Sequence, residues 1–327
     1  MMVTKKEIAD YLGVSRTAVS LVLNNAPNHT ISAKTRKDIL EAAKKLGYRH
    51  SQVQPKLCFI LYNRESEDPL YMSELNTIEN IAKKNGYWLL YINIKLDSED
   101  FHKLPEFLGS QEISGIVLTG DIDDHIIRLV EESSVPYVVF SSYFKENMNI
   151  IVSDMEKLAY QATNYLISYG HEKITLYSGN LKTPVHQQTL SGYKKALAEK
   201  NIGFDPSYVQ VSNEEDGYEL ASRMELLGIP YTAAICVNTL IQFGAIQYLK
   251  DTGKQVPLDI SLIGLGYNEI VKMSHPKLTT MFINNEEKEI VVNRLIDLIK
   301  HKDKERKIIY LEKGNLFEGD TVTKRKF

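Results

Sequence analysis

Apolar residues recur at helical spacing in three short runs near the start of the chain. Spacing of three and four residues places the apolar side chains of each run on one face, which predicts three short amphipathic helices between residues 4 and 48. The apolar positions are Ile8, Ala9, Leu12, Val19, Val22, Leu23, Ile39, Ala42, Ala43 and Leu46.

Local signals mark where these helices begin and end. Thr4 and Glu7 have the spacing of a capping box, and Ser15 and Ser32 can each cap a following helix. Gly13 follows the last apolar position of the first helix, where a left-handed backbone ends a helix at little cost. The first two helices are therefore so close in sequence that they must cross sharply.

The second helix has an outward face near its N-terminal half. With its apolar side buried, Arg16, Thr17, Ser20 and Leu21 point outward. A helix-turn-helix motif uses that half of its second helix to contact base edges in the major groove. The pattern predicts a DNA-binding head.

The charge distribution supports this interpretation. Residues 1–56 contain ten Lys or Arg against four Asp or Glu, a balance of +6, which leaves −9 for the remainder of a chain whose total is −3. Such an asymmetry indicates a polyanionic partner for the basic segment. The alternative is a solvated basic hairpin that contacts other proteins. Side chains suited to phosphate contacts are Lys34, Arg36, Lys37, Lys44 and Lys45.

Beyond residue 56, short apolar runs alternate with helical patterns, as is typical of βαβ units around parallel sheets. The predicted helices are at about 71–85, 122–133, 154–169, 187–200, 239–251 and 285–301. The predicted strands are Leu57–Tyr62, Tyr87–Ile94, Gly115–Thr119, Tyr137–Ser141, Lys173–Ser178, Ala233–Val237, Ile260–Gly264 and Met281–Ile283.

Composition excludes several classes of protein. No stretch approaches the roughly 20 apolar residues of a membrane-spanning helix, and the first residues lack an apolar secretory region, so we expect a cytoplasmic protein without a membrane partner. Cys58 and Cys236 lie in apolar runs far apart in sequence, which indicates free buried thiols.

Enzyme motifs and metal-binding motifs are absent from the sequence. It contains no Walker loop, no zinc-type Cys/His cluster and no G-x-S-x-G elbow. Gly264-Leu265-Gly266 lacks the third glycine of a dinucleotide fingerprint and is better explained as a strand-end turn. We therefore expect no catalytic residues, no metal and no cofactor.

At the head the sequence resembles the LacI/GalR family of bacterial transcription regulators, and the resemblance extends over essentially the whole chain. It implies a helix-turn-helix domain at 1–48, a linker at 49–56, and at 57–327 an α/β sensor domain of two lobes, like a periplasmic binding protein. The matching residues are Ile8-Ala9, Gly13-Val14-Ser15, Val19-Ser20, Leu23-Asn24, Ile31-Ser32, Thr35-Arg36, Gly170-His171, Ile260-Ser261-Leu262-Ile263-Gly264, Pro276 and Leu278-Thr279-Thr280.

The family pattern and the loops after strands yield two sets of candidate residues. Those expected at DNA are Thr4, Ser15, Arg16, Thr17, Ser20, Leu21, Asn24, Asn25, Ser32, Lys34, Thr35 and Arg36. Those expected around an effector between the lobes are Asn63, Asp68, Tyr71, Ser141, Asp154, Thr189, Asn238 and Tyr267, with Arg64, Ser142, Tyr143 and Asn180 in the same loops. For any one of the loop residues a capping or turn role is the alternative, and Asp154 is the clearest case.

Three departures from the family pattern bear on function. Leu21 replaces an Arg that could contact guanine, which predicts a different operator sequence. The segment 49–56 is shorter than the family's linker, and its Pro55 disfavours the usual hinge helix, which predicts less DNA bending. Thr189 and Gly266 stand where relatives place an Arg and an Asp that bind sugar hydroxyls or anions.

Together these features predict a homodimeric repressor that binds an inverted-repeat operator and responds to a small-molecule effector such as a sugar or a related metabolite. One alternative is a regulator whose lobes serve chiefly to dimerise or to bind a protein. Another is a cytoplasmic small-molecule-binding protein related to sugar transport components.

Overall fold

The computed structural model describes residues 3–23, 31–46, 48, 54–96, 98–110, 113–141, 148–301 and 306–325. The chain divides into two compact units, Met1–Gln54 and Pro55–Phe327, which we call the head and the sensor unit. The division falls inside the segment 49–56 that was expected to link the domains.

The head contains three helices whose apolar faces pack together. Thr4 and Glu7 form the predicted capping box, in which the amide of Thr4 donates to the Glu7 carboxylate at 2.6 Å. Gly13 ends the first helix with a φ of 67°, and the second begins three residues later. The predicted helix-turn-helix arrangement is confirmed. The helices are α1 (Lys5–Leu12), α2 (Arg16–Leu23) and α3 (Ala33–Lys45).

The core of the head consists of the apolar residues that recur at helical spacing in the sequence. Eight of the ten are buried, and Leu12 and Leu46 pack against them at the edge. The head is thus a small unit with one core, and its stability depends on few side chains. The buried residues are Ile8, Ala9, Val19, Val22, Leu23, Ile39, Ala42 and Ala43.

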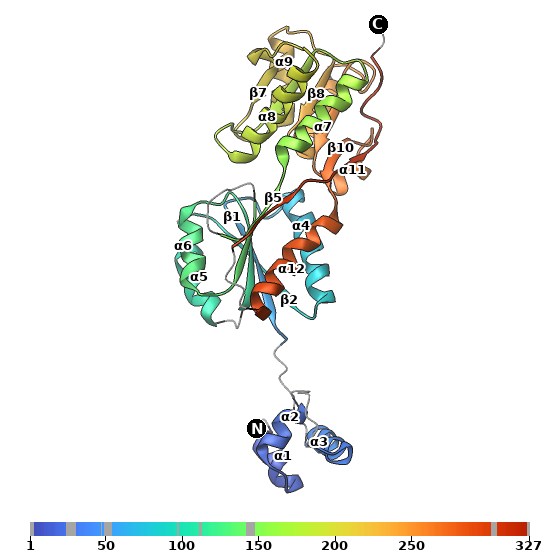
Figure 1. The fold of residues 1–327 in the computed structure, drawn as a ribbon. Helices are drawn as coiled ribbons and strands as arrows, with labels where there is room; N and C mark the ends of the chain where they lie inside the picture. Colours follow the sequence, from blue (N-terminus) through green and yellow to red (C-terminus); the bar gives the residue numbers. More distant parts are fainter. Residues whose placement is uncertain are drawn as a thin grey trace. The chain divides into compact units, whose positions relative to one another are not determined.

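The first lobe of the sensor unit is a parallel sheet with the strand order β11-β5-β4-β3-β1-β2. Helices α4 and α12 cover one face, and α5 and α6 cover the other (Figure 1). Both faces are buried, which explains why β1 is a continuous apolar run. The elements are β1 (Lys56–Tyr62), α4 (Pro69–Lys84), β2 (Trp88–Ile94), α5 (Glu99–Ser110), β3 (Ile113–Gly120), α6 (Asp124–Glu132), β4 (Tyr137–Phe140), β5 (Ile150–Ser153), α12 (Asn285–His301) and β11 (Ile308–Leu311).

The second lobe repeats this architecture with the strand order β12-β10-β9-β8-β6-β7, in which β12 is antiparallel to β10. Helices α7 and α8 pack on one face, and α9 and α10 pack on the other. The elements are α7 (Met155–Ser168), β6 (Ile174–Ser178), α8 (Pro184–Glu199), a short 3-10 helix η1 (Pro206–Tyr208), β7 (Val209–Val211), α9 (Gly217–Leu226), β8 (Ala233–Cys236), α10 (Thr239–Asp251), β9 (Ser261–Leu265), α11 (Glu269–Met273), β10 (Thr279–Ile283) and β12 (Gly314–Phe317).

The chain passes between the two lobes three times. It leaves the first lobe after β5, returns after β10 and leaves again after β11 (Figure 1). These connections place the carboxyl ends of strands from both sheets next to the space between the lobes. The predicted α/β sensor domain of two lobes is confirmed.

All eight predicted strands and six predicted helices are present, with ends shifted by a few residues. The missed strands are short, and β12 forms only by pairing with the distant β10. Helix α5 was also missed. It contains Pro105 in its interior, and proline usually interrupts a helix. The elements that the sequence pattern missed are β5, β7, β11, β12, α5, α9 and α11.

Both cysteines are free and buried, as predicted. Burial raises the pKa of the Cys58 thiol to about 12 and also raises the pKa of Cys236. Both thiols therefore stay protonated at neutral pH, which makes them poor nucleophiles.

Candidate functional sites

Helix α2 carries the residues expected at base edges on its outer side. Arg16 and Thr17 are exposed, and Ser20 and Leu21 are half-buried. The Oγ of Ser20 accepts a hydrogen bond from the Nζ of Lys5 on α1 at 3.3 Å. The start of α2 thus offers a guanidinium, two hydroxyls and one aliphatic side chain, the groups that distinguish base pairs in the major groove.

Hydroxyl side chains cap all three helices of the head. Thr4, Ser15 and Ser32 each accept a hydrogen bond from an amide in the first turn of α1, α2 and α3. Helix N-termini attract phosphate groups through their free amides. Asn24 and Asn25, expected at DNA, lie outside the described residues. The predicted DNA-contacting residues around the start of α3 are the exposed Lys34 and the half-exposed Thr35 and Arg36.

A cavity of about 330 Å³ lies between the two lobes of the sensor unit. Its lining includes segments that follow β1, β3 and β4 in the first lobe and β7, β8 and β9 in the second, together with parts of α4 and the start of α8. This is where parallel sheets bind ligands. Of the loop candidates, Ser142 and Tyr143 lie outside the described residues. The expected effector residues that line the cavity are Tyr71, Ser141, Asn238 and Tyr267, and Arg64 lines it with them.

The other four expected effector residues do not line the cavity. Asp68 caps α4, and its Oδ1 accepts a hydrogen bond from a backbone amide at 2.9 Å. Asp154 caps α7 in the same way, at 2.8 Å. Asn63 has a φ of 59° in the turn after β1. Thr189 is buried within α8, and its hydroxyl donates to the carbonyl of Val185. Capping, turn and packing roles account for the placement of these four side chains.

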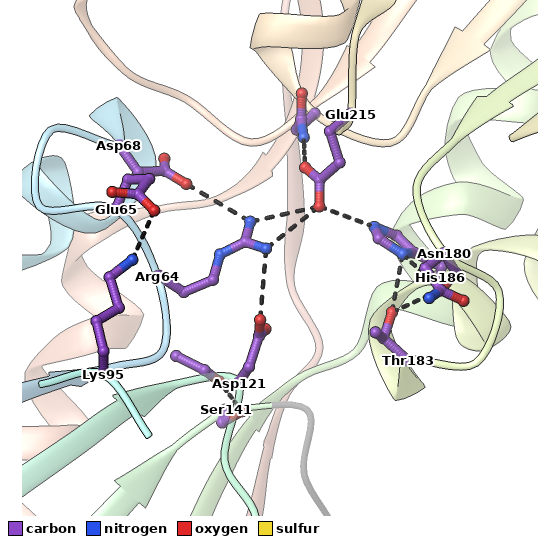
Figure 2. Close-up of polar contacts among 12 residues, drawn as sticks. Arg64, Glu65, Asp68, Lys95, Asp121, Ser141, Asn180, Thr183, His186 and Glu215 are labelled. Atoms are coloured by element: carbon purple, nitrogen blue, oxygen red, sulfur yellow. Dashed lines mark hydrogen bonds and ion pairs between the residues drawn. The ribbon is translucent and has the colours of Figure 1, made fainter. Parts of the chain in front are cut away.

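Arg64 stands at the centre of an ionic cluster at the cavity (Figure 2). Its guanidinium lies 3.6 Å from Asp68, 3.7 Å from Asp121 and 3.3 Å from Glu215. It also lies over the Tyr71 ring, 5.5 Å from the ring centre. Burial opposes the charge of Arg64, but the acidic groups around it raise its pKa. Because Glu215 belongs to the second lobe and Arg64 to the first, this ion pair connects the lobes.

Residues of the second lobe hold Glu215 in place (Figure 2). Its Oε2 accepts from the side-chain amide of Asn238 at 2.6 Å, and its Oε1 lies 3.7 Å from Nε2 of His186. His186 Nδ1 lies 2.8 Å from the hydroxyl of Thr183 and 3.0 Å from the carbonyl of Asn180. Glu215 itself has a φ of 53°, a strained conformation for a residue with a side chain.

Sequence reasoning missed Asp121, His186 and Glu215. Asp121 lies two residues after the end of the predicted strand Gly115–Thr119, so the rule that selected Arg64 could have found it. Glu215 follows β7, which the sequence pattern did not predict, and His186 lies just before the predicted start of its helix. The same rule therefore could not reach these two residues.

A second buried ion pair lines the cavity. Glu74 on α4 lies 3.8 Å from Nζ of Lys288 on α12, and both side chains are nearly inaccessible to solvent. Burial raises the pKa of Glu74 from 4.5 to about 7, and the nearby Lys288 counteracts only part of this effect. The folded protein therefore favours the protonated form of Glu74.

This pKa predicts a pH dependence of stability. Because the folded pKa of Glu74 exceeds its unfolded value, its contribution is complete below about pH 4.5 and is lost as the pH rises through about 7. Between pH 5 and 8 the wild type is expected to lose about 2 kcal/mol or slightly more relative to Glu74→Gln. Urea unfolding at several pH values measures this difference. The control is Glu79→Gln on the exposed side of the same helix, and equal pH profiles for wild type and Glu74→Gln would contradict the prediction.

Comparison with known proteins agrees with this arrangement. Residues 4–51 match the family model for bacterial regulatory proteins of the lacI family, and residues 54–286 match the model for periplasmic binding proteins and the sugar binding domain of the LacI family. The chain is 28% identical over 320 residues to the transcriptional repressor PurR of Histophilus somni (strain 129Pt), covering 94% of this chain and 96% of that protein. It is 30% identical over 315 residues to PurR of Haemophilus influenzae (strain PittEE), covering 92% and 93%.

Solved structures share the same fold. A lac repressor dimer bound to its operator and to the anti-inducer ONPF matches with a TM-score of 0.80 and 22% identity, covering 99% of this chain and all of that one. The transcriptional regulator CelR in complex with cellobiose matches with a TM-score of 0.74 and 21% identity, covering 98% and 99%. The similarity thus includes both the head and the sensor unit.

Proposed function

Since the chain belongs to the LacI family of bacterial regulatory proteins and is a DNA-binding transcriptional regulator, we propose that it represses transcription as a homodimer on an inverted-repeat operator. Two copies related by a twofold axis would present one head to each half-site. The observation that carries the proposal is the head, in which Ser15 caps α2, Arg16 and Thr17 on α2 are exposed, and basic side chains outnumber acidic ones. A repressor of this kind acts in the cytoplasm. Within the part of the chain that the structure describes, no helix is long and apolar enough to cross a membrane.

A gel-shift titration with the DNA upstream of the protein's own gene tests this function. We expect affinity to fall steeply with salt, because phosphate contacts release counterions, while a specific complex survives competitor DNA. Binding that competitor DNA abolishes at every salt concentration would overturn the proposal.

Leu21 is proposed to give this protein its own base preference. Its half-buried side chain lies on the outer side of α2 and offers only apolar contact, for example with a thymine methyl group. We expect Leu21→Arg to change the selected operator toward guanine at the contacted position, with about 1–3 kcal/mol of discrimination. Operator selection from random DNA measures this, with Tyr11→Phe on the exposed side of α1 as control. An unchanged preferred sequence would count against a role for Leu21 in contacting bases.

The short junction is proposed to bend operator DNA less than the family's usual hinge helix does. The absence of a hinge helix was inferred from the segment 49–56, and residues 49–53 of that segment lie outside the described residues. Pro55 supports the proposal, because proline disfavours a helical residue before it. Circular-permutation gel shifts on the operator complex report the bend angle, and a strong central kink would contradict this part of the proposal.

The sensor unit is proposed to bind a small-molecule effector in the cavity between its lobes. The support for this proposal is a cavity of about 330 Å³ that is lined by polar groups from both lobes. A ligand that contacts both lobes would favour one arrangement of them. Operator gel shifts with pooled metabolites test it. If none of the pools changes operator affinity, the alternative in which the lobes only dimerise or bind a protein is favoured.

A further inference from the structure

The ionic cluster around Arg64 has more negative than positive charge. Three carboxylates, those of Asp68, Asp121 and Glu215, lie within 4 Å of the single guanidinium of Arg64 (Figure 2). Burial raises the pKa values of Asp68 and Asp121, while Arg64 lowers them. One cation therefore balances only part of the negative charge, and the cluster as a whole favours an additional positive charge.

The carboxylates of the cluster differ in their freedom to bind a ligand. Asp68 is occupied as the cap of α4 and does not line the cavity. Asp121 and Glu215 both line it, and they approach from opposite lobes. The side chain of Asp121 is 44% exposed, so it can accept a further hydrogen-bond donor without first losing Arg64. These two acids thus form a pair of acceptors across the cavity.

The guanidinium in the ionic cluster offers little to an anionic ligand. Arg64 is held by the three carboxylates. Lys288 is buried against Glu74, which compensates its charge only in part because burial raises the pKa of that carboxyl. Lys182 is exposed to solvent, where an ion pair contributes little. His186 already faces Glu215 and Thr183. An anion near Arg64 would therefore also face Asp121 and Glu215, and the resulting repulsion would offset its attraction to the guanidinium.

Much of the remaining lining is apolar or aromatic. Tyr267 stacks on Phe282 with 4.6 Å between ring centres, and both line the cavity with Phe140 and Tyr71. Around them are aliphatic side chains from both lobes. Such walls favour a flat or apolar ligand body, and aromatic faces also attract cations. The branched aliphatic lining residues are Leu70, Ile122, Leu158, Val185, Val237, Leu265 and Ile283.

From this arrangement we propose that the effector carries a positively charged nitrogen group on an apolar or aromatic body. Asp121 and Glu215 hold the charged group beside Arg64, and the aromatic walls enclose the body. Asp121 belongs to the first lobe and Glu215 to the second. A ligand bound to both carboxylates therefore adds a connection between the lobes to the ion pair of Arg64 and Glu215. This inference rests on the proposed effector-binding function and names the chemistry of its ligand.

Three probes with one body and different charges test the proposal on the full chain. They are tyramine, which is cationic, tyrosol, which is neutral, and 4-hydroxyphenylacetate, which is anionic. In isothermal titration calorimetry at pH 7 we expect tyramine to bind at least tenfold more tightly than tyrosol, and the anion to bind most weakly. The shared phenol ring keeps the apolar contacts equal, so the differences report the charge preference of the cavity.

Substitutions of the two carboxylates test whether they bind the charged group of tyramine. Glu215→Gln and Asp121→Asn are each expected to weaken tyramine binding at least tenfold. Glu214→Gln, a change of an exposed neighbour with the same loss of charge, is expected to leave it unchanged. Thermal melting and operator gel shifts of each variant check that the sensor unit and the head remain folded.

Several results would overturn the proposal. These are equal or tighter binding of tyrosol or of the anion, no binding of any probe, or tyramine binding that Glu215→Gln does not weaken. The broader effector function is tested separately. It would be refuted if no metabolite pool changed operator affinity. A neutral or anionic metabolite that changes operator affinity would leave that function standing and refute only the cationic ligand.

Discussion

Val19→Asp is expected to abolish operator binding while leaving the sensor unit folded. Val19 is fully buried on α2, in a core of eight residues. An unpaired carboxylate in such a site costs about 3–5 kcal/mol, which is comparable to the whole stability of a domain this small. The sensor unit has its own hydrophobic cores and should melt at an unchanged temperature.

Circular dichroism and operator gel shifts measure these two outcomes on one preparation. Leu40→Asp is the matched control, because it adds the same carboxylate at a side chain on α3 that is 50% exposed. We expect this control to keep a folded head. Operator affinity of Val19→Asp within threefold of the wild type would show that α2 does not depend on this packing.

Gly120→Ala is expected to destabilise the sensor unit by about 3 kcal/mol, which lowers its melting temperature by roughly 6 °C or more. Gly120 ends β3 with a φ of 107°, and an added Cβ would lie 2.1 Å from the backbone carbonyl oxygen of Tyr62. Neither the strain nor this clash can be relieved by a side-chain movement. The displaced backbone would also move Asp121 away from Arg64.

Differential scanning calorimetry of the full chain measures this loss. Gly109→Ala is the control, since Gly109 is exposed in helix α5 with open space around its Cα. There alanine is expected to be neutral or to stabilise by up to about 1 kcal/mol, because it favours the helix. Equal melting temperatures for the two variants would contradict the account of Gly120.

The sequence predicted the head almost completely because its signals are local. The capping box of Thr4 and Glu7 spans four residues, and each apolar face repeats within two turns. In the sensor unit, strands buried on both faces appear as apolar runs, which is why β1 and β8 were found. Strands β7 and β12 are short and only partly buried, so they left no comparable pattern.

The candidate effector site was predicted only in part. Strand-end rules led to Tyr71, Ser141, Asn238 and Tyr267, which line the cavity. The same rules selected Asp154, although its side chain caps α7. A polar residue after a strand can serve as a cap or face a ligand, and the residue type alone does not distinguish these roles.

By itself, the sequence determined the three helices of the head, the alternation of strands and helices in the sensor unit, and the excess of basic side chains in residues 1–56. Only the tertiary structure decided that Arg64 meets Glu215, a residue 151 positions away. That contact depends on how the chain passes between the lobes and on the left-handed turn at Glu215. Short-range forces fix caps and helical faces from neighbouring residues, whereas the charges at the cavity meet only after both lobes have folded and packed together.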